Sequence, residues 1–286
     1  MLRRALAVAF AVSIAQAWQN QSPAAPAGPP HLVNSHSVLR LSGQEKTQVT
    51  EDVVYADNGG QTQKTDIYLP QGVRKSDRLP AVIALSGGDF TKHWGFYKDL
   101  GRQIAASGMA GVIPDKRYRR GQHVEGSEDI ASLMKYLAEN GEQHNIDGSR
   151  VCLWAFSAGG LLLSTGMGGQ TPQVKCLVNF YAVTDLSPFP DVSPEVAASD
   201  YNPIQRLRAD PSKVPPVMVV RAGKDSEVLN RGLDAFVSEA LARNVEVVAV
   251  NYPEGQHGFD LWDDNDTSRR IIRQALEFER LHLGVH

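Results

Sequence analysis

The feature that most constrains the fold is an apolar, β-rich run that ends on a serine among small residues, 151–160 (VCLWAFSAGG). Such a run predicts a nucleophile elbow, in which a buried strand passes into a helix through a strained turn that exposes the serine hydroxyl above the sheet. The positions two before and two after Ser157 lie where strand and helix nearly touch, so they need small side chains. Ala155 and Gly159 meet that need. Taken alone, the motif also fits a Ser-Ala-Gly-Gly helix start without chemistry.

Two later loops carry the partners that such a serine requires. Residues 216–220 (PVMVV) have the pattern of a buried strand, and Asp225 lies in the turn that follows. Residues 245–252 form the next strand pattern, and His257 lies in the loop after it. In open α/β folds the loops after the parallel strands meet at one edge of the sheet. The order serine, acid, histidine therefore predicts a catalytic triad of Ser157, Asp225 and His257, with Asp225 assigned by its position.

These residues carry a family resemblance. The chain resembles an α/β-hydrolase of the esterase/lipase group, above all the dienelactone-hydrolase-like and acetyl-esterase-like members that have a Ser-Ala-Gly-Gly elbow and a His-Gly-Phe ending. The resemblance covers about residues 50–284, and the segment 145–150 (NIDGSR) is typical of it. It implies an α/β-hydrolase fold and hydrolysis of carboxylic esters through an acyl-enzyme intermediate. Ala155 replaces the glycine of the strict motif, a variant familiar in some lipases of this group.

A second chemical element is the loop 85–90 (LSGGDF), directly after an apolar strand. In the esterases that the chain resembles, this loop reads His-Gly-Gly-Gly and donates backbone N–H groups to the oxyanion, a charge that fixed donors stabilise without reorganisation. The resemblance assigns the oxyanion hole to Ala158 and to Gly88 or Asp89. Ser86 replaces the family histidine that usually braces the loop, and the Asp89 carboxylate must turn outward or bind a substrate group. The alternative is a plain Gly-Gly turn.

Strands and amphipathic helices alternate along the chain, which predicts a mostly parallel central sheet with helices on both faces. The predicted strands are an antiparallel hairpin, 47–56 with 64–69, and core strands at 81–85, 109–113, 151–156, 176–181, 216–220 and 245–252. The predicted helices are 94–106, 127–140, 229–242 and 267–283, the last capped at Asp266.

Substrate specificity is expected in the segments that this fold leaves variable. Residues 185–216 form an insertion rich in Pro, Ser and Asp, which is too short for a large multi-helix lid and so favours short-acyl esters over long-chain triglyceride. Phe90, Trp94 and Tyr118 are candidates for the substrate pocket, and each fits the ordinary core equally well.

Composition sets the class and the compartment. The 286 residues, 42% hydrophobic and 21% charged, predict one catalytic domain at 47–286, and a net charge of −3 gives no sign of a nucleic-acid partner. Arg3 and Arg4 precede a short apolar run and the small-x-small site Ala15-Gln16-Ala17, which predicts a signal peptide at 1–17 rather than an uncleaved anchor. Residues 18–46 are then a flexible mature leader. We expect a secreted or periplasmic protein without stable membrane insertion after cleavage.

Two cysteines in an exported chain suggest a disulfide. Cys152 and Cys176, however, open adjacent predicted strands, where free cysteines serve as small apolar residues, and the geometric window for a bridge is narrow. The expectation is therefore that they stay free. We expect no cofactor and no metal, because the acidic cluster near 260–266 flanks a helix start, where the dipole favours carboxylates.

The preferred interpretation is an exported serine carboxylesterase that acts on a small-molecule or carbohydrate ester, with acetyl groups on sugars as one candidate. A peptidase related to prolyl oligopeptidase has the same triad order, but the sequence has no propeller domain. A degenerate hydrolase kept as a binding protein is the non-enzyme alternative, motivated by Ala155, Ser86 and Asp89. The sequence leaves the acyl group, the alcohol and the oligomeric state open.

Overall fold

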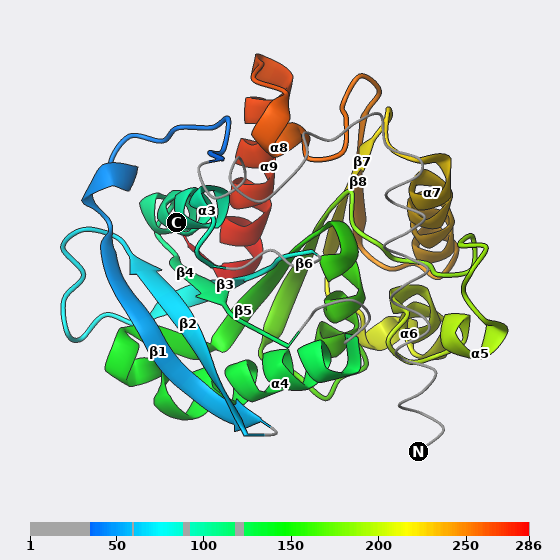
Figure 1. Ribbon diagram of the computed structural model, residues 1–286. Coiled ribbons are helices and arrows are strands. Elements are labelled where there is room, and N and C mark those ends of the chain that lie inside the picture. The colour runs from blue at the N-terminus through cyan, green and yellow to red at the C-terminus, as the bar shows by residue number, and fades with distance from the viewer. Residues whose placement is uncertain (1–34, 59, 88–91, 118–122, 286) are drawn as a thin grey trace.

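An eight-stranded sheet forms the centre of the molecule (Figure 1), and its strand order is β1-β2-β4-β3-β5-β6-β7-β8. The computed structural model describes residues 35–58, 60–87, 92–117 and 123–285. The strands are β1 Gln48–Asn58, β2 Gln61–Leu69, β3 Leu79–Leu85, β4 Ala110–Pro114, β5 Ile146–Phe156, β6 Val174–Phe180, β7 Val217–Ala222 and β8 Val247–Tyr252. The pairs β1–β2 and β2–β4 are antiparallel, and the remaining neighbours in this sheet are parallel. The predicted mostly parallel sheet is confirmed.

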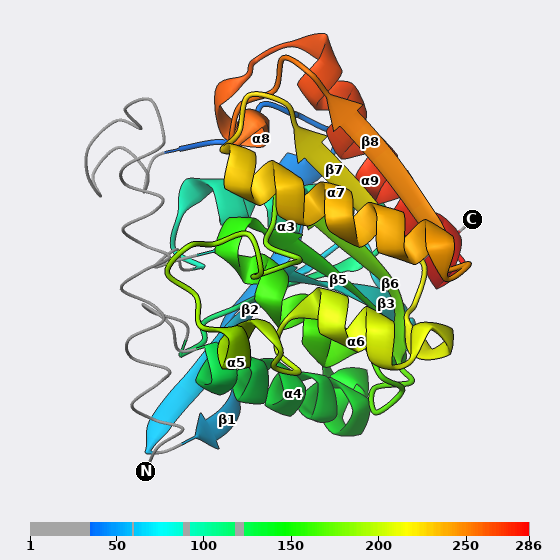
Figure 2. The ribbon, with the colours of Figure 1, turned by 90° about the vertical axis from the view of Figure 1, so that its right-hand side faces the viewer.

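Helices cover both faces of the sheet (Figure 2). On one face lie α3 Gly95–Ala106 and α9 Asp266–Leu283, and on the other lie α4 His123–Asn140, α6 Pro203–Ala209 and α7 Glu227–Ala242. The burial of α9 explains its position, because Ile272, Ala275, Leu276 and Leu283 recur at helical spacing and all are buried. This arrangement leaves the carboxyl ends of the parallel strands free to carry functional loops.

An aromatic core fixes the middle of the sheet beneath those loops. Trp154 and Phe156 of β5 stack with ring centroids 5.5 Å apart, and Phe180 of β6 meets Trp154 edge-on at 5.0 Å. Phe259, just past β8, packs on Phe180 at 5.3 Å. Buried aromatic contacts of this kind resist displacement. The end of β5, where Ser157 follows, is therefore a rigid platform.

The segment before the sheet is packed rather than flexible. Leu39 is fully buried, and the Gln103 side chain of α3 donates to its carbonyl at 2.8 Å. Asp99 of the same helix accepts from Arg40 at 2.6 Å. The flexible leader predicted for 18–46 therefore does not extend through 35–46, because an apolar side chain and two polar anchors hold that part on α3. The predicted signal peptide lies outside the described residues.

The start of α9 differs by one residue from the prediction. The helix begins at Asp266, but its N-cap is Asn265, whose side chain accepts from the Ser268 backbone N–H at 3.0 Å. Both residue types cap helices well, and the extended backbone of Asn265 gives it the capping role.

Cys152 and Cys176 form a disulfide, contrary to the expectation of free thiols. The parallel register of β5 and β6 places the two residues directly opposite each other, with their Cα atoms 4.7 Å apart. That separation falls inside the window that a bridge requires. The strands were predicted correctly, but the consequence of their register was not.

The insertion 185–216 folds into short helices against the body of the protein. It contains α5 Pro194–Ala197, α6 and the 3-10 turn Pro211–Lys213. Phe189 is buried in a small cluster with Leu161, Val183 and Leu186, and Tyr201 meets His123 edge-on at 5.2 Å.

Within the described residues, no helix is both long enough and apolar enough to cross a membrane.

Candidate active site

The serine lies at a strained turn at the end of β5. Ser157 has a φ of 57°, in the left-handed region that few residues other than glycine adopt. A Cβ at Gly159 would lie 2.1 Å from the Leu85 carbonyl oxygen, and one at Gly160 would lie 2.2 Å from that of Val183. Glycine is therefore required at both positions, and the fully buried Ala155 is as small as the sequence pattern demanded. A 3-10 helix, Ser157–Gly166, leads away from the turn.

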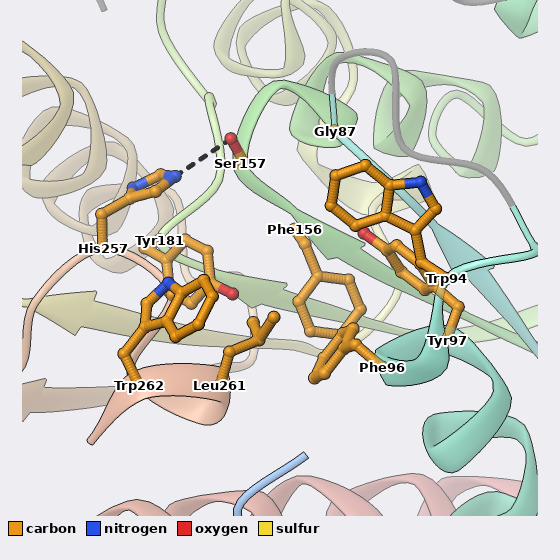
Figure 3. Close-up of a pocket in the computed structure, with 11 residues that line it drawn as sticks. Gly87, Trp94, Phe96, Tyr97, Phe156, Ser157, Tyr181, His257, Leu261 and Trp262 are labelled. Carbon is orange, nitrogen blue, oxygen red and sulfur yellow. Dashed lines mark hydrogen bonds between the residues drawn. The ribbon is translucent and has the colours of Figure 1, made fainter. Parts of the chain in front are cut away.

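The structure brings the three predicted triad residues together. His257 Nε2 lies 3.1 Å from Ser157 Oγ, the interaction dashed in Figure 3, and His257 Nδ1 lies 2.6 Å from Asp225 Oδ2. Asp225 follows β7, and its other oxygen accepts from the backbone N–H of Ser226 at 2.6 Å. This second hydrogen bond fixes the carboxylate, which in turn orients the imidazole. The arrangement lets His257 take a proton from Ser157 while Asp225 stabilises the imidazolium.

A buried pair behind His257 was not predicted. The Tyr181 ring meets the imidazole edge-on with centroids 4.7 Å apart, and the Tyr181 hydroxyl donates to Asp260 Oδ1 at 2.5 Å. Asp260 is buried, which raises the pKa of its carboxyl to about 7. Burial also raises the pKa of Tyr181 well above its usual value, so this phenol stays a hydrogen-bond donor. The pair holds one side of the imidazole in place.

The oxyanion side of the site begins at Gly87. A Cβ at Gly87 would lie 2.7 Å from Ser157 Cβ and 2.9 Å from the Ala158 backbone nitrogen, so the loop after β3 presses on the elbow. This contact places Gly87, the residue directly before the donors predicted in that loop, beside Ala158. Gly88 and Asp89 lie outside the described residues.

An apolar pocket of about 70 Å³ opens beside Ser157 and His257 (Figure 3). Its volume is far below the roughly 300–1,000 Å³ of sites for drug-sized ligands. The walls come from α3 and the residue before it, from the ends of β5 and β6, and from the short helix α8 Phe259–Trp262. Beside the two triad members they consist of Gly87, Trp94, Phe96, Tyr97, Phe156, Tyr181, Gly258, Leu261 and Trp262.

Of the predicted pocket residues, Trp94 lines the pocket, whereas Phe90 and Tyr118 lie outside the described residues. Sequence reasoning missed Leu261 and Trp262, although they follow the His-Gly-Phe ending by only a few positions and a short helix there would point back at His257. It also placed specificity in the insertion 185–216, but no residue of that insertion is among those that line this pocket.

The acidic cluster near 260–266 is used internally. Asp263 accepts from the Gln256 backbone N–H at 3.1 Å, and Asp264 and Asp266 both pair with Arg269. Among the described residues, no group of three or more His, Cys, Asp or Glu side chains is arranged to hold a metal ion.

A known family model matches the middle of the chain. Residues 65–231 match the family model BD-FAE, which spans more than half of the chain and includes Ser157 and Asp225. The chain belongs to the BD-FAE family, which is of the α/β-hydrolase type, and this membership confirms the expected class of enzyme, a hydrolase of the esterase kind. A search of curated proteins finds no match.

Several solved structures with the same fold are esterases. A thermostable esterase from Pseudomonas putida superposes with a TM-score of 0.70 at 21% identity, covering 86% of this chain and 85% of that one. An esterase from Thermogutta terrifontis with propionate bound gives 0.68 at 19% identity, covering 85% and 96%. One from Pyrobaculum calidifontis gives 0.68 at 23% identity, covering 82% and 85%. At these identities the likeness establishes the α/β-hydrolase fold.

Proposed function

We propose that this protein is a serine carboxylesterase that hydrolyses short-chain carboxylic esters through a Ser157-His257-Asp225 triad. The observation that carries the proposal is the position of His257, which hydrogen-bonds Ser157 on one ring nitrogen and Asp225 on the other beside a small apolar pocket. A serine hydroxyl is a weak nucleophile by itself, and this is the arrangement that activates it.

The geometry supports a two-stage reaction. In the first stage Ser157 Oγ attacks the ester carbonyl carbon while His257 Nε2 takes the hydroxyl proton. The tetrahedral intermediate then collapses, and His257 returns the proton to the leaving alcohol, which leaves an acyl group on Ser157. In the second stage water attacks the acyl-enzyme with His257 again as base. His257 then returns the proton to Ser157 Oγ as the carboxylic acid departs. We assign stabilisation of the oxyanion in both stages to the backbone N–H of Ala158, whose nitrogen lies beside Gly87.

The pocket supports a short acyl group. Its volume of about 70 Å³ accommodates only a few carbon atoms, and bulky aromatic side chains close it. The Thermogutta terrifontis esterase of the same fold has been solved with propionate bound, which is consistent with a short acyl chain here. Trp262 is 40% exposed beside this pocket, and its ring offers an apolar face on which a sugar ring can pack. Acetyl groups on carbohydrates are therefore the natural substrates that we favour.

A chain-length series tests the proposal. The purified protein is assayed against p-nitrophenyl acetate, butyrate, octanoate and dodecanoate and against acetylated xylan, with Ser157→Ala as control. We expect kcat/KM to be highest for acetate or butyrate, acetate release from the xylan, and loss of turnover in the variant. No hydrolysis of any ester would favour a binding protein, and cleavage of a prolyl peptide substrate in place of esters would favour a peptidase.

We also propose export of the protein. The apolar N-terminal segment with its Ala15-Gln16-Ala17 site suits a signal peptidase, and the Cys152–Cys176 disulfide is typical of an oxidising compartment. Expression of the full chain in a bacterial host, followed by mass spectrometry of the periplasmic fraction, should give a mature N-terminus at Trp18. An uncleaved chain in the cytoplasm would contradict this proposal.

A further inference from the structure

Two side chains from other elements hold Ser86 and Gly87 at the end of β3. Lys116, two residues past β4, donates from Nζ to Ser86 Oγ at 2.5 Å. The Tyr97 hydroxyl, from α3, is hydrogen-bonded to the Ser86 side chain and to the Gly87 backbone. Both Ser86 and Tyr97 are buried. Segments from three parts of the chain thus meet at the first residues of the loop.

This network acts next to the nucleophile. Gly87 lies so close to Ser157 and to the Ala158 nitrogen that a side chain at Gly87 could not fit between them. A displacement of Ser86 therefore moves Gly87 directly against the elbow. Ser86 occupies the position where the esterases that this chain resembles have a bracing histidine. In this protein Lys116 and Tyr97 supply the brace instead, and Lys116 adds a charge.

The surroundings of Lys116 bring the pKa of its ammonium group close to neutral pH. Burial lowers the pKa of its ammonium to about 8, and Asp115 and Asp129 oppose that shift. Asp129 is paired with Arg117 at 2.8 Å, and Asp115 lies near the Lys92 and His93 side chains. Lys116 is therefore mostly charged at pH 7 and mostly neutral at pH 9. Lys116 is half-buried, so solvent screens its charge less than that of an exposed lysine.

We propose that Lys116 is a positioning residue for the ester hydrolysis: through Ser86 it holds Gly87 against Ser157, and its positive charge favours the oxyanion that forms beside Ser157. The inference rests on the proposed esterase function and adds to it a group outside the triad. Because Lys116 is not among the residues that line the pocket beside Ser157, it should affect kcat more than KM.

The test compares three variants of the purified protein. Lys116→Met removes the charge and keeps the length of the side chain, and Ser86→Ala removes the hydrogen-bonding partner. Lys175→Met, at a half-buried lysine of β6, is the matched control. We expect Lys116→Met to lower kcat for p-nitrophenyl acetate about tenfold with KM little changed, less than the loss of a direct oxyanion donor. In a Ser86→Ala background the same substitution should have a smaller effect. The control should match wild type.

The pH profile separates a charge effect from a purely structural one. Wild-type kcat/KM should fall above about pH 8 as Lys116 loses its proton, and Lys116→Met should lack this decline while its melting temperature is no lower than that of wild type. Full activity in Lys116→Met, an unchanged alkaline decline, or an activity loss explained by unfolding overturns the inference. An absence of ester turnover in wild type overturns the proposed function with it, whereas wild-type turnover with an unaffected variant overturns only the role of Lys116.

Discussion

At the scale of single residues, the site depends on how firmly His257 is held. Asp225 hydrogen-bonds one ring nitrogen, and the Tyr181 ring packs against the imidazole. The Tyr181 hydroxyl is in turn held by Asp260. A catalytic base must stay within hydrogen-bonding distance of its nucleophile, so both supports matter to the rate. The two supports differ in kind, because Asp225 acts on the imidazole through its charge and hydrogen bond, whereas Tyr181 acts through packing.

Asp225→Asn tests the charged support. Asparagine keeps the size of the side chain but favours the wrong imidazole tautomer, so we expect kcat to fall on the order of 10⁴-fold with the fold intact. Asp185→Asn is the comparison, because Asp185 is also buried but accepts from Ser187 and lies away from His257. A loss below tenfold for Asp225→Asn, together with an inactive Asp185→Asn, would show that the acid lies elsewhere.

Asp260→Asn tests the buried carboxyl. Between its ordinary pKa of 3.8 and its folded value of about 7, the folded protein holds a proton that the unfolded chain has lost. Wild type therefore loses stability as the pH rises through this window. Asparagine still accepts from Tyr181 and does not ionise, so from pH 4 to pH 8 the variant should gain up to about 4 kcal/mol in unfolding free energy relative to wild type. Urea unfolding at both pH values measures this, and a difference independent of pH would contradict it.

At the scale of elements, local patterns predicted most of the fold and the triad. Short stretches of sequence indicate the buried strands, the helix faces and the order Ser157, Asp225, His257. The three triad residues meet because the strands that precede them end at the same edge of the sheet. What could not be predicted depends on contacts between distant stretches. The pairing of Tyr181 with Asp260, and of Lys116 with Ser86, joins residues that are far apart in the chain, and neither residue pair has a sequence motif of its own.

The helix α8 shows what a closer inspection of the sequence could have found. Gly258 has a φ of 75°, and the positive φ turns the chain so that Leu261 and Trp262 face the pocket. The glycine after His257 was visible in the sequence as part of the His-Gly-Phe ending. Its structural consequence, a one-turn helix over the site, was not, because a four-residue helix has no periodicity to detect.

Trp262→Ala tests the role of α8 in acyl selection. Removal of the indole extends the pocket next to Ser157, so we expect kcat/KM for p-nitrophenyl octanoate to rise at least tenfold relative to acetate, as about 2 kcal/mol of newly buried chain would allow. Leu241→Ala, an exposed apolar residue of α7, is the control. If the preference is unchanged in Trp262→Ala, another wall limits the acyl chain.

At the scale of the whole molecule, the disulfide ties together the two strands beneath the site. Both cysteines lie four residues before the end of their strands, Cys152 in β5 and Cys176 in β6. Counting back from the ends of two in-register parallel strands would have placed them opposite each other. The free-thiol expectation failed because the strands were considered one at a time.

Replacement of both cysteines by alanine measures the contribution of this crosslink. The sequence separation of 24 residues implies a stabilisation of about 3 kcal/mol in the chain-entropy model. We expect the free energy of unfolding of the double variant, measured with urea, to be lower by that amount. Its kcat should stay within about twofold of wild type, because the triad residues lie beyond the strand ends. Equal stability of the two proteins would show that the crosslink adds nothing.

The central claim is that Ser157 is the nucleophile of a hydrolase, and covalent labelling tests it most directly. The folded protein is treated with a fluorophosphonate, digested and analysed by mass spectrometry, with His257→Ala as the matched control. We expect one adduct per chain on Ser157, loss of ester turnover in proportion to labelling, and at least a hundredfold slower labelling without the histidine base. Labelling of a different serine with loss of activity, or equal labelling rates in wild type and His257→Ala, would contradict it.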